Sequence, residues 1–226
     1  MEIKEIGYLK THFPTKFGVP RQSGVSKSSP ATLVFNEEYR VPEALAGLEK
    51  YSHVWVIWGF SESKYDKFSP TVRPPRLGGN TRVGVFASRS PFRPNSLALS
   101  VLKLESIEKT AKFGHVLHLS GADMMDGSPV YDVKPYIPFA DSIPDAVGGF
   151  TEALEDFILD VNIPDEIKNK LPSELLPCLT EALENDPRPS YIDDPSRIYG
   201  FFYDDYEVKF TVDGKTLRVV SIEKVK

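Results

Sequence analysis

The chain has 226 residues, enough for one or two domains with a sizeable buried core. Its hydrophobic content of 41% and charged content of 26% are typical of a globular protein that stays in solution. No apolar run is long enough to span a bilayer, and the single cysteine, Cys178, excludes an intrachain disulfide and a cysteine-rich metal site. We therefore expect a cytoplasmic protein with no membrane partner and no metal.

The first part of the chain predicts strands, in segments rich in β-branched and aromatic residues. In chain order these segments are 2–9, 53–60, 82–88, 97–107, 115–123 and 129–136. One short helix is expected over 42–50, with Pro42 near its first turn. Several short strands with little helix between them favour a mainly β fold, either a barrel or a sandwich, over a doubly wound α/β fold.

The pattern changes near residue 145, where Gly148 and Gly149 interrupt the chain. Over 165–185 an apolar residue recurs every four positions, which predicts helix, although Pro172 and Pro177 should break or kink it. The recurring residues are Ile167, Leu171, Leu175, Leu179 and Leu183. The chain closes with two strands joined at Asp213-Gly214, a hairpin signal. We predict a β-rich domain over 1–145 and a smaller α+β domain over 146–226.

Charge is unevenly distributed between these two parts. The net charge of the whole chain is −5, and it divides into +3 over 1–145 and −8 over 146–226. Residues 67–104 contain no acidic residue but carry five arginines. Such a stretch is a candidate surface for phosphates, and the alternative is a solvated surface whose acidic residues lie elsewhere in space.

Several familiar sites are excluded by their spacing. The chain has no G-x-G, so it lacks the dinucleotide-binding fingerprint, and it has no G-x-S-x-G nucleophile turn. Gly79 and Gly84 have the spacing of a phosphate-binding loop, but Val85 follows where that loop needs lysine. His115 and His118 should face opposite sides of a strand, which argues against a shared metal.

Four polar segments remain beside the expected strand ends: 19–24, 73–80, 89–100 and 121–138. In the last of these, Asp132, Lys134 and Tyr136 should share one face of a strand, as a pocket wall or as a solvent face. Each segment alone is explained by turn chemistry, because Gly, Pro, Asn and Asp are common in loops. Together they form a set of arginine- and carboxylate-bearing loops that turns alone do not require.

The residues of these segments, with one later segment, resemble the motifs of a known protein family. PRQSG, RPPRLGGN, GVFASRSPFRPN, DGSPVYDVKPYIPFADS and DPRPSY resemble, in order and over nearly the whole chain, the TsaA-like (TrmO) family of tRNA methyltransferases. The resemblance implies a β-barrel catalytic domain, not of the Rossmann type, that uses S-adenosyl-L-methionine. It also implies methylation of N6 of the threonylcarbamoyl-modified adenine 3′ of the anticodon, a homodimer, and a second domain with a role in tRNA recognition.

The resemblance further implies a cofactor site built from Pro20, Arg21, Gln22, Ser61, Glu62, Arg89, Leu99, Ser120, Gly121, Ala122 and Asp123. For catalysis we expect a general base or strong acceptor among Asp126, Asp132 and Tyr136, with Lys134 stabilising charge or holding the substrate carboxylate. Candidate RNA contacts are Arg73, Arg76, Arg82, Arg93, Asn95, Arg188, Tyr191 and Arg197.

Two other functions stay open on the sequence. One is an RNA-interaction or sensing module that binds S-adenosylmethionine without transferring its methyl group. The other is a methyltransferase for a small molecule, for which the second domain would be dispensable.

Overall fold

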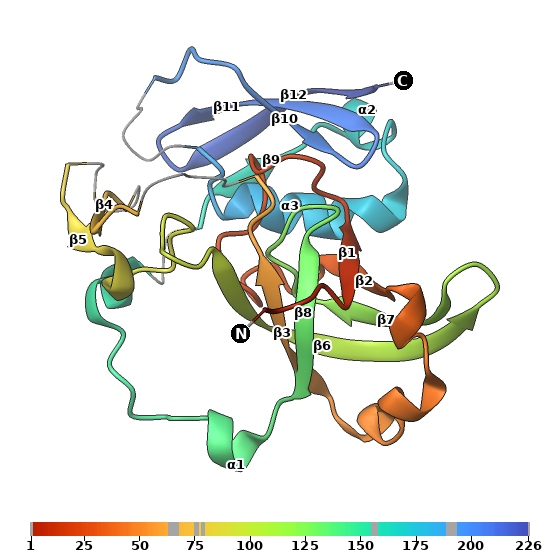
Figure 1. Cartoon of the computed structure of the whole chain (residues 1–226). Coiled ribbons are helices and arrows are strands. Elements are labelled where there is room, and N and C mark those ends of the chain that lie inside the picture. Colours follow the sequence, from red (N-terminus) through yellow and green to blue (C-terminus); the bar gives the residue numbers. More distant parts are fainter. Residues whose placement is uncertain are drawn as a thin grey trace.

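The computed structural model describes residues 2–62, 68–74, 77, 80–154, 158–188 and 194–225. Within these residues the chain forms a closed six-stranded barrel and, above it in Figure 1, a four-stranded sheet backed by short helices. This confirms the predicted mainly β fold, a barrel followed by a small α+β part. No helix among the described residues is long and apolar enough to cross a membrane.

The barrel strands follow the order β1-β2-β7-β6-β3-β8, and every neighbouring pair is antiparallel. Their bounds are β1 Gly7–Thr11, β2 Pro30–Phe35, β3 His53–Gly59, β6 Leu97–Thr110, β7 Gly114–Ser120 and β8 Pro129–Pro135. Along β3 the residues alternate, so Val54, Val56 and Trp58 are buried in the barrel while the residues between them face outward. The sequence predicted five of these strands approximately, and β2 was missed.

Two local predictions were wrong for identifiable reasons. The helix expected over 42–50 is instead a pair of 3-10 turns, η2 Pro42–Leu45 and η3 Leu48–Lys50, because Gly47 between them has a left-handed backbone with φ 88°. A further 3-10 turn, η1 Glu37–Tyr39, precedes them. The strand expected over 82–88 does not join the barrel. Its first part, β5 Val83–Gly84, pairs only with β4 Thr71–Val72, and the 3-10 turn η5 Val85–Ala87 follows.

The second part of the chain forms the sheet β10-β11-β12-β9, in which β9 runs parallel to β12 and the other pairs are antiparallel. Its strands are β9 Asp160–Asn162, β10 Tyr199–Tyr203, β11 Tyr206–Asp213 and β12 Thr216–Lys224. The predicted hairpin at Asp213-Gly214 is confirmed by β11 and β12.

The helical stretch predicted over 165–185 is broken near its prolines into α2 Asp165–Lys168, η7 Ser173–Leu175 and α3 Leu176–Glu184. All five of its recurring apolar residues are buried, as the spacing predicted. The short helix α1 Pro138–Asp141 and the 3-10 turn η6 Gly149–Leu154 lie in the connection between the barrel and the second sheet.

The loop joining β1 to β2, residues 12–29, belongs to the barrel in sequence but packs into the second core. Phe13 is fully buried there, and Phe17 and Val19 pack against the same cluster. Gly18 has φ 93°, and a Cβ at this position would overlap the ring of Phe201, so only glycine fits. The β1–β2 loop is therefore held by the second domain.

Candidate active site

Most of the polar residues singled out by the sequence gather at one end of the barrel. There β1, β3 and β7 finish while β2, β6 and β8 begin, so the loops 12–29, 60–62, 88–96 and 121–128 meet. Backbone hydrogen bonds join them, from Gly24 N–H to the Gly121 carbonyl (3.0 Å) and from Phe60 N–H to the Ser96 carbonyl (3.1 Å). We call this end of the barrel the loop end.

Asp123 is the most perturbed acid at the loop end. Its carboxylate Oδ1 accepts a hydrogen bond of 2.6 Å from the hydroxyl of Ser100, which in turn accepts one of 2.9 Å from the indole N–H of Trp58. Ser100 is 1% exposed and points into the barrel, so the chain of hydrogen bonds runs from the core to the rim. The removal of water by burial raises the pKa of Asp123 from 3.8 to about 6, against the hydrogen bond from Ser100.

A cation lies next to this acid. Arg89 lowers the pKa of Asp123 through its charge, although by less than burial raises it, and the backbone N–H of Ser23 also lowers it. The guanidinium of Arg89 donates a hydrogen bond to the side-chain oxygen of Gln22. The PRQSG segment, the RSPFRPN segment and the end of β7 are thus brought together, as the resemblance implied. Which of these residues bind a cofactor stays a prediction.

Gly121 explains how closely the loops approach each other. It has φ 85°, and a Cβ there would lie 3.4 Å from the backbone nitrogen of Gly24. Ala122, the next residue, is fully buried and belongs to the barrel core. A backbone that turns sharply between the strand and Asp123 therefore sets where the carboxylate sits.

A cavity of about 780 Å³ opens beside the loop end and is lined by Ser61, Asn95, Gly127 and Tyr131 among others. This volume suits a small-molecule ligand. Glu62 is exposed. The cavity lining does not include Asp123 or Arg89, so the structure separates the sequence-predicted residues into two neighbouring groups. Among the described residues, no three His, Cys, Asp or Glu side chains are grouped so as to hold a metal.

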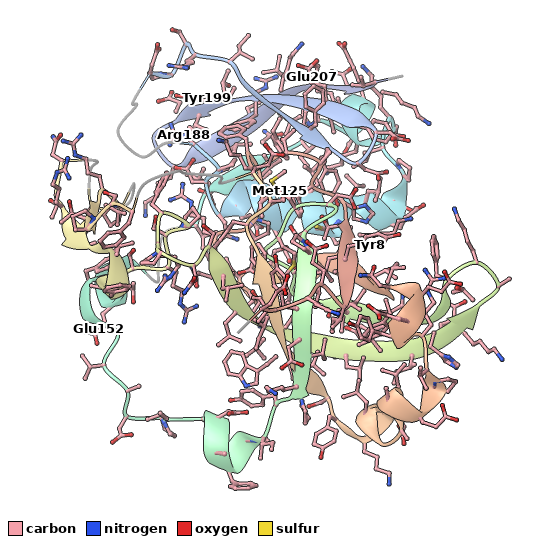
Figure 2. The ribbon with its side chains drawn as sticks, in the orientation of Figure 1. Tyr8, Met125, Glu152, Arg188, Tyr199 and Glu207 are labelled. Carbon is pink, nitrogen blue, oxygen red and sulfur yellow. The ribbon has the colours of Figure 1, made fainter. Side chains whose placement is uncertain are left out.

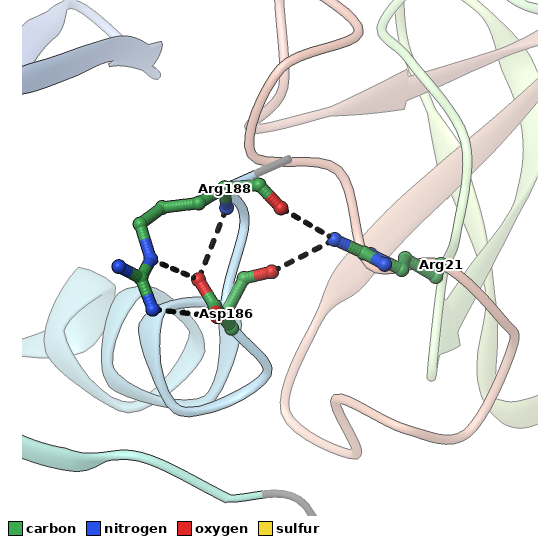
Figure 3. Close-up of polar contacts among 3 residues, drawn as sticks. All are labelled: Arg21, Asp186 and Arg188. Atoms are coloured by element: carbon green, nitrogen blue, oxygen red, sulfur yellow. Dashed lines mark hydrogen bonds and ion pairs between the residues drawn. The ribbon is translucent and has the colours of Figure 1, made fainter. Parts of the chain in front are cut away.

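Arg21 has a contact that the sequence did not suggest. Its terminal nitrogen Nη2 donates to the carbonyl of Asp186 at 3.0 Å and to the carbonyl of Arg188 at 2.8 Å, both in the second domain (Figure 3). Pro20, just before it, is buried. These contacts link the predicted cofactor loop to the turn that follows α3.

Two other predicted cofactor residues are turned elsewhere. Leu99 faces outward from the barrel opposite Ile57 and is 51% exposed. The hydroxyl of Ser120 donates to Glu105 at 2.6 Å, which lowers the pKa of that glutamate. Within this single chain, neither side chain is linked to the Asp123 group by a described hydrogen bond.

The four predicted catalytic residues do not form one group. Asp126 lies at the loop end, where its Oδ1 accepts the backbone N–H of Thr11 at 3.0 Å. Asp132 and Lys134 form an ion pair of 2.9 Å on the outer face of β8, as the shared-face prediction required. Tyr136 lies just beyond the far end of β8, where its ring is 5.8 Å from that of Trp55. Only Asp126 is near Asp123 in the chain and at the same barrel end.

The predicted RNA contacts also differ in accessibility. Arg73, Arg82, Asn95 and Arg197 are exposed, and Arg93 is half-buried with its guanidinium donating to the Ser88 carbonyl. Arg76 and Tyr191 lie outside the described residues.

The structure corrects the prediction that Arg188 is an exposed candidate for RNA contact. Its side chain is 9% exposed, pairs with Asp186 at 2.9 Å, and has its guanidinium carbon 6.0 Å from the ring centre of Tyr199 (Figure 2). Hydrogen bonding to Asp186 and the charge of that residue raise the Arg188 pKa against the opposing effect of burial, so Arg188 is a buried structural cation, not a surface contact.

Sequence reasoning missed Ser100, Ser23 and the contact made by Arg21. Ser100 had a usable signal, since its hydroxyl lies two positions from the apolar residues Ala98 and Leu102 and so on the inward face of the strand. The partners of Ser23 and Arg21 left no local signal, because they lie in other loops.

Replacing Asp123 tests the burial of its charge. Because folding raises this pKa, the folded state is most stabilised relative to the unfolded state below about pH 4, and that advantage is lost as the pH rises through 6. We expect Asp123→Asn to increase the free energy of unfolding by about 1–3 kcal/mol at pH 8 and by little at pH 4. Urea unfolding at both pH values measures the free energy of unfolding. Asp160→Asn, which replaces an exposed acid, is the control. An equal effect at both pH values would contradict the raised pKa.

Comparison with known proteins places the chain in a family. The model of the tRNA-methyltransferase O N-terminal domain matches residues 8–142, and that of the TrmO C-terminal domain matches 158–225. The tRNA (adenine(37)-N6)-methyltransferase of Escherichia coli is 35% identical over 98% of this chain and 97% of its own. The enzyme of the same name from Eikenella corrodens is 47% identical over 72% of this chain and 92% of its own.

A solved structure agrees. The crystal structure of TrmO from Pseudomonas aeruginosa superposes with a TM-score of 0.78 at 31% identity, covering 99% of this chain and 98% of that one. Both family domains, a relative over nearly the whole length and a full-length structural match point the same way. The chain therefore belongs to the tRNA-methyltransferase O family and is a methyltransferase.

Proposed function

We propose that this protein transfers a methyl group from S-adenosyl-L-methionine to N6 of the threonylcarbamoyl-modified adenine on the 3′ side of the anticodon in tRNA. The relatives from Escherichia coli and Eikenella corrodens are named as methyltransferases of N6 of adenine 37 in tRNA, which supports this position and this atom. The threonylcarbamoyl group and the homodimer are parts of the proposal that rest on the resemblance, and the cytoplasmic location rests on the composition and the single cysteine.

The loop end fits the charges of S-adenosylmethionine, which carries a carboxylate, an ammonium and a sulfonium. Arg89 suits the carboxylate, because a guanidinium forms paired hydrogen bonds to it. Asp123 suits a cation or a ribose hydroxyl, and a cation beside it would relieve the unfavourable burial of its charge. Gln22, which holds Arg89, would orient that guanidinium. This acid and base pair on one rim is the observation that carries the proposal.

The reaction itself needs alignment and the removal of one proton. The sulfonium supplies an activated methyl group, so its carbon–sulfur bond breaks as the bond to N6 forms, and S-adenosylhomocysteine leaves. Holding donor and acceptor in line can lower the barrier by roughly 7–11 kcal/mol. The N6–H proton must pass to an acceptor, and carbamoylation makes that proton more acidic. Asp126 is the candidate that this subunit itself places at the loop end.

The prediction for Asp126 is a loss of the chemical step. We expect Asp126→Asn to lower the single-turnover methylation rate by about 10²-fold or more without a comparable change in cofactor affinity. Asp132→Asn and Tyr136→Phe are the matched comparisons, and rapid-quench mixing with excess enzyme measures all three. A full rate in Asp126→Asn with a loss in Asp132→Asn would assign the proton to the outer face of β8, and with a loss in Tyr136→Phe to the far end of that strand. In either case a neighbouring subunit would bring that residue to the site.

A separate surface is suited to RNA. β4 and β5 form a small arm beside the barrel (Figure 1), within the segment 67–104 that contains no acidic residue. The rings of Phe68 and Phe86 stack there with centres 6.3 Å apart, although they are 52% and 73% exposed. Arg82 lies on the same arm and donates to the hydroxyl of Thr71 at 2.7 Å. Exposed aromatic rings beside cations are the usual means of holding unpaired bases and phosphates.

Removing one ring should weaken RNA binding. We expect Phe86→Ala to reduce tRNA affinity by about 1–3 kcal/mol, the worth of one stacked base, with no loss of folding stability because the ring is exposed. Filter binding or fluorescence anisotropy measures it. Tyr51→Ala, an exposed aromatic residue (41%) outside this arm, is the control and should bind normally. Unchanged affinity in Phe86→Ala would remove the arm from the RNA-binding surface.

The proposed reaction is tested on two tRNA transcripts of the same sequence, one with and one without the threonylcarbamoyl group. Each is incubated with the protein and S-adenosylmethionine, then digested and examined by mass spectrometry. We expect a gain of one CH2 on the threonylcarbamoyl nucleoside alone. A gain on unmodified adenine would correct the acceptor. No gain on either transcript, with cofactor still bound, would favour the sensing module or a small-molecule acceptor.

A further inference from the structure

We propose that the second domain sets the geometry of the cofactor site through the β1–β2 loop, with Arg21 and Glu181 as positioning residues. The inference rests on the proposed cofactor site and goes beyond it, since it gives the second domain a role in cofactor binding that is separate from any contact with RNA.

The loop is fixed on one side by apolar packing. Phe13 is fully buried in the core of the second domain, and the ring of Tyr203 meets it edge-on at 5.5 Å. Phe17 packs edge-on against Phe201 with ring centres 6.2 Å apart. A loop with two aromatic anchors in another domain cannot move without opening that domain's core.

Hydrogen bonds to the second domain hold the same side of the loop in addition to this packing. The carboxylate oxygen Oε2 of Glu181, on α3, accepts both the hydroxyl of Ser26 and the backbone N–H of Ser28, each at 2.9 Å. Further along, the guanidinium of Arg21 donates to two backbone carbonyls of the turn after α3 (Figure 3). We call these four hydrogen bonds the clasp.

The turn that receives Arg21 is itself rigid. The carboxylate of Asp186 accepts hydrogen bonds from the backbone N–H of Arg188 at 3.2 Å and from its guanidinium at 2.9 and 3.1 Å. Both side chains are almost fully buried, so this ion pair is shielded from water and ordered by several hydrogen bonds. The clasp therefore joins the loop to a stiff support.

The opposite side of the loop forms part of the candidate cofactor site. Gln22 accepts a hydrogen bond from Arg89, and the backbone N–H of Ser23 donates to Asp123. These residues directly follow Arg21 and precede Ser26, so they lie between the two halves of the clasp. Loosening the clasp would let Gln22 and Ser23 drift from Arg89 and Asp123, and cofactor binding would weaken.

Glu181 is the sharper test, because it lies in the second domain, whereas Arg21 is itself one of the predicted cofactor residues. We expect Glu181→Ala to raise the dissociation constant of S-adenosylmethionine about tenfold, because the loop loses both hydrogen bonds that Glu181 accepts and part of that loss reaches the cofactor site. Glu181→Gln should bind within about threefold of the wild type, since one amide oxygen can accept both hydrogen bonds that Oε2 accepts. Glu174→Ala, an exposed acid of the same domain, is the charge control and should bind normally.

Titration calorimetry with S-adenosylmethionine and the full chain, without RNA, gives these affinities, and circular dichroism melting shows that each variant is folded at the working temperature. Equal affinity in Glu181→Ala and the wild type, or an equal loss in Glu174→Ala, would overturn the positioning role while leaving the proposed function intact. A wild type that binds no S-adenosylmethionine would overturn the cofactor assignment, and this inference with it.

Discussion

The β1–β2 loop must satisfy two domains at once, and much of the arrangement at the loop end follows from that constraint. Its aromatic residues are buried in the second core, so their apolar surface can leave water only if the second domain is present. Its next residues meet Arg89 and Asp123 at the barrel rim. A loop that is held at both the second domain and the barrel rim has few conformations left, so its residues have well-defined positions.

The arrangement at the loop end also raises the pKa of Asp123, because it buries this carboxylate. A loop that covers the rim removes water from the carboxylate, and this raises its pKa more than Ser100, Ser23 and Arg89 together lower it. The folded protein therefore carries an acid whose charge is only partly compensated. A cationic group entering the site supplies the missing compensation, so binding such a ligand and ionising Asp123 favour each other. A barrel rim with such an acid can select a cationic ligand in this way.

The elements and buried faces that the sequence predicted correctly are those with a repeating apolar pattern or a clear β composition. The four-residue spacing around α3 predicted its buried face, because a core requires only a repeating apolar pattern. The β-branched and aromatic residues of β3 predicted a strand, and its alternation of buried and outward residues came from the structure. Motif matching placed Gln22, Arg89 and Asp123 at one site without saying how they meet. The acceptors of Arg21 lie 165 and 167 positions later in the chain, and nothing local to Arg21 records them. Arg188 was misread because a buried, paired arginine and a surface arginine look the same in sequence.

The internal use of Arg21 and Arg188 also bears on how RNA could approach. Both make contacts within the protein, and Arg188, which belongs to the second domain, is buried against Asp186, so this domain with its net charge of −8 gains no exposed cation from it. Two exposed arginines, Arg73 and Arg82, belong to the segment 67–104 that forms the arm and contains no acidic residue, and Phe68 and Phe86 belong to the same segment. A polyanion is drawn to that side and repelled by the other. In the proposed complex with tRNA, the acidic domain would restrict the direction of approach, and its attachment to the β1–β2 loop supports the separate role that we propose for it in building the cofactor site.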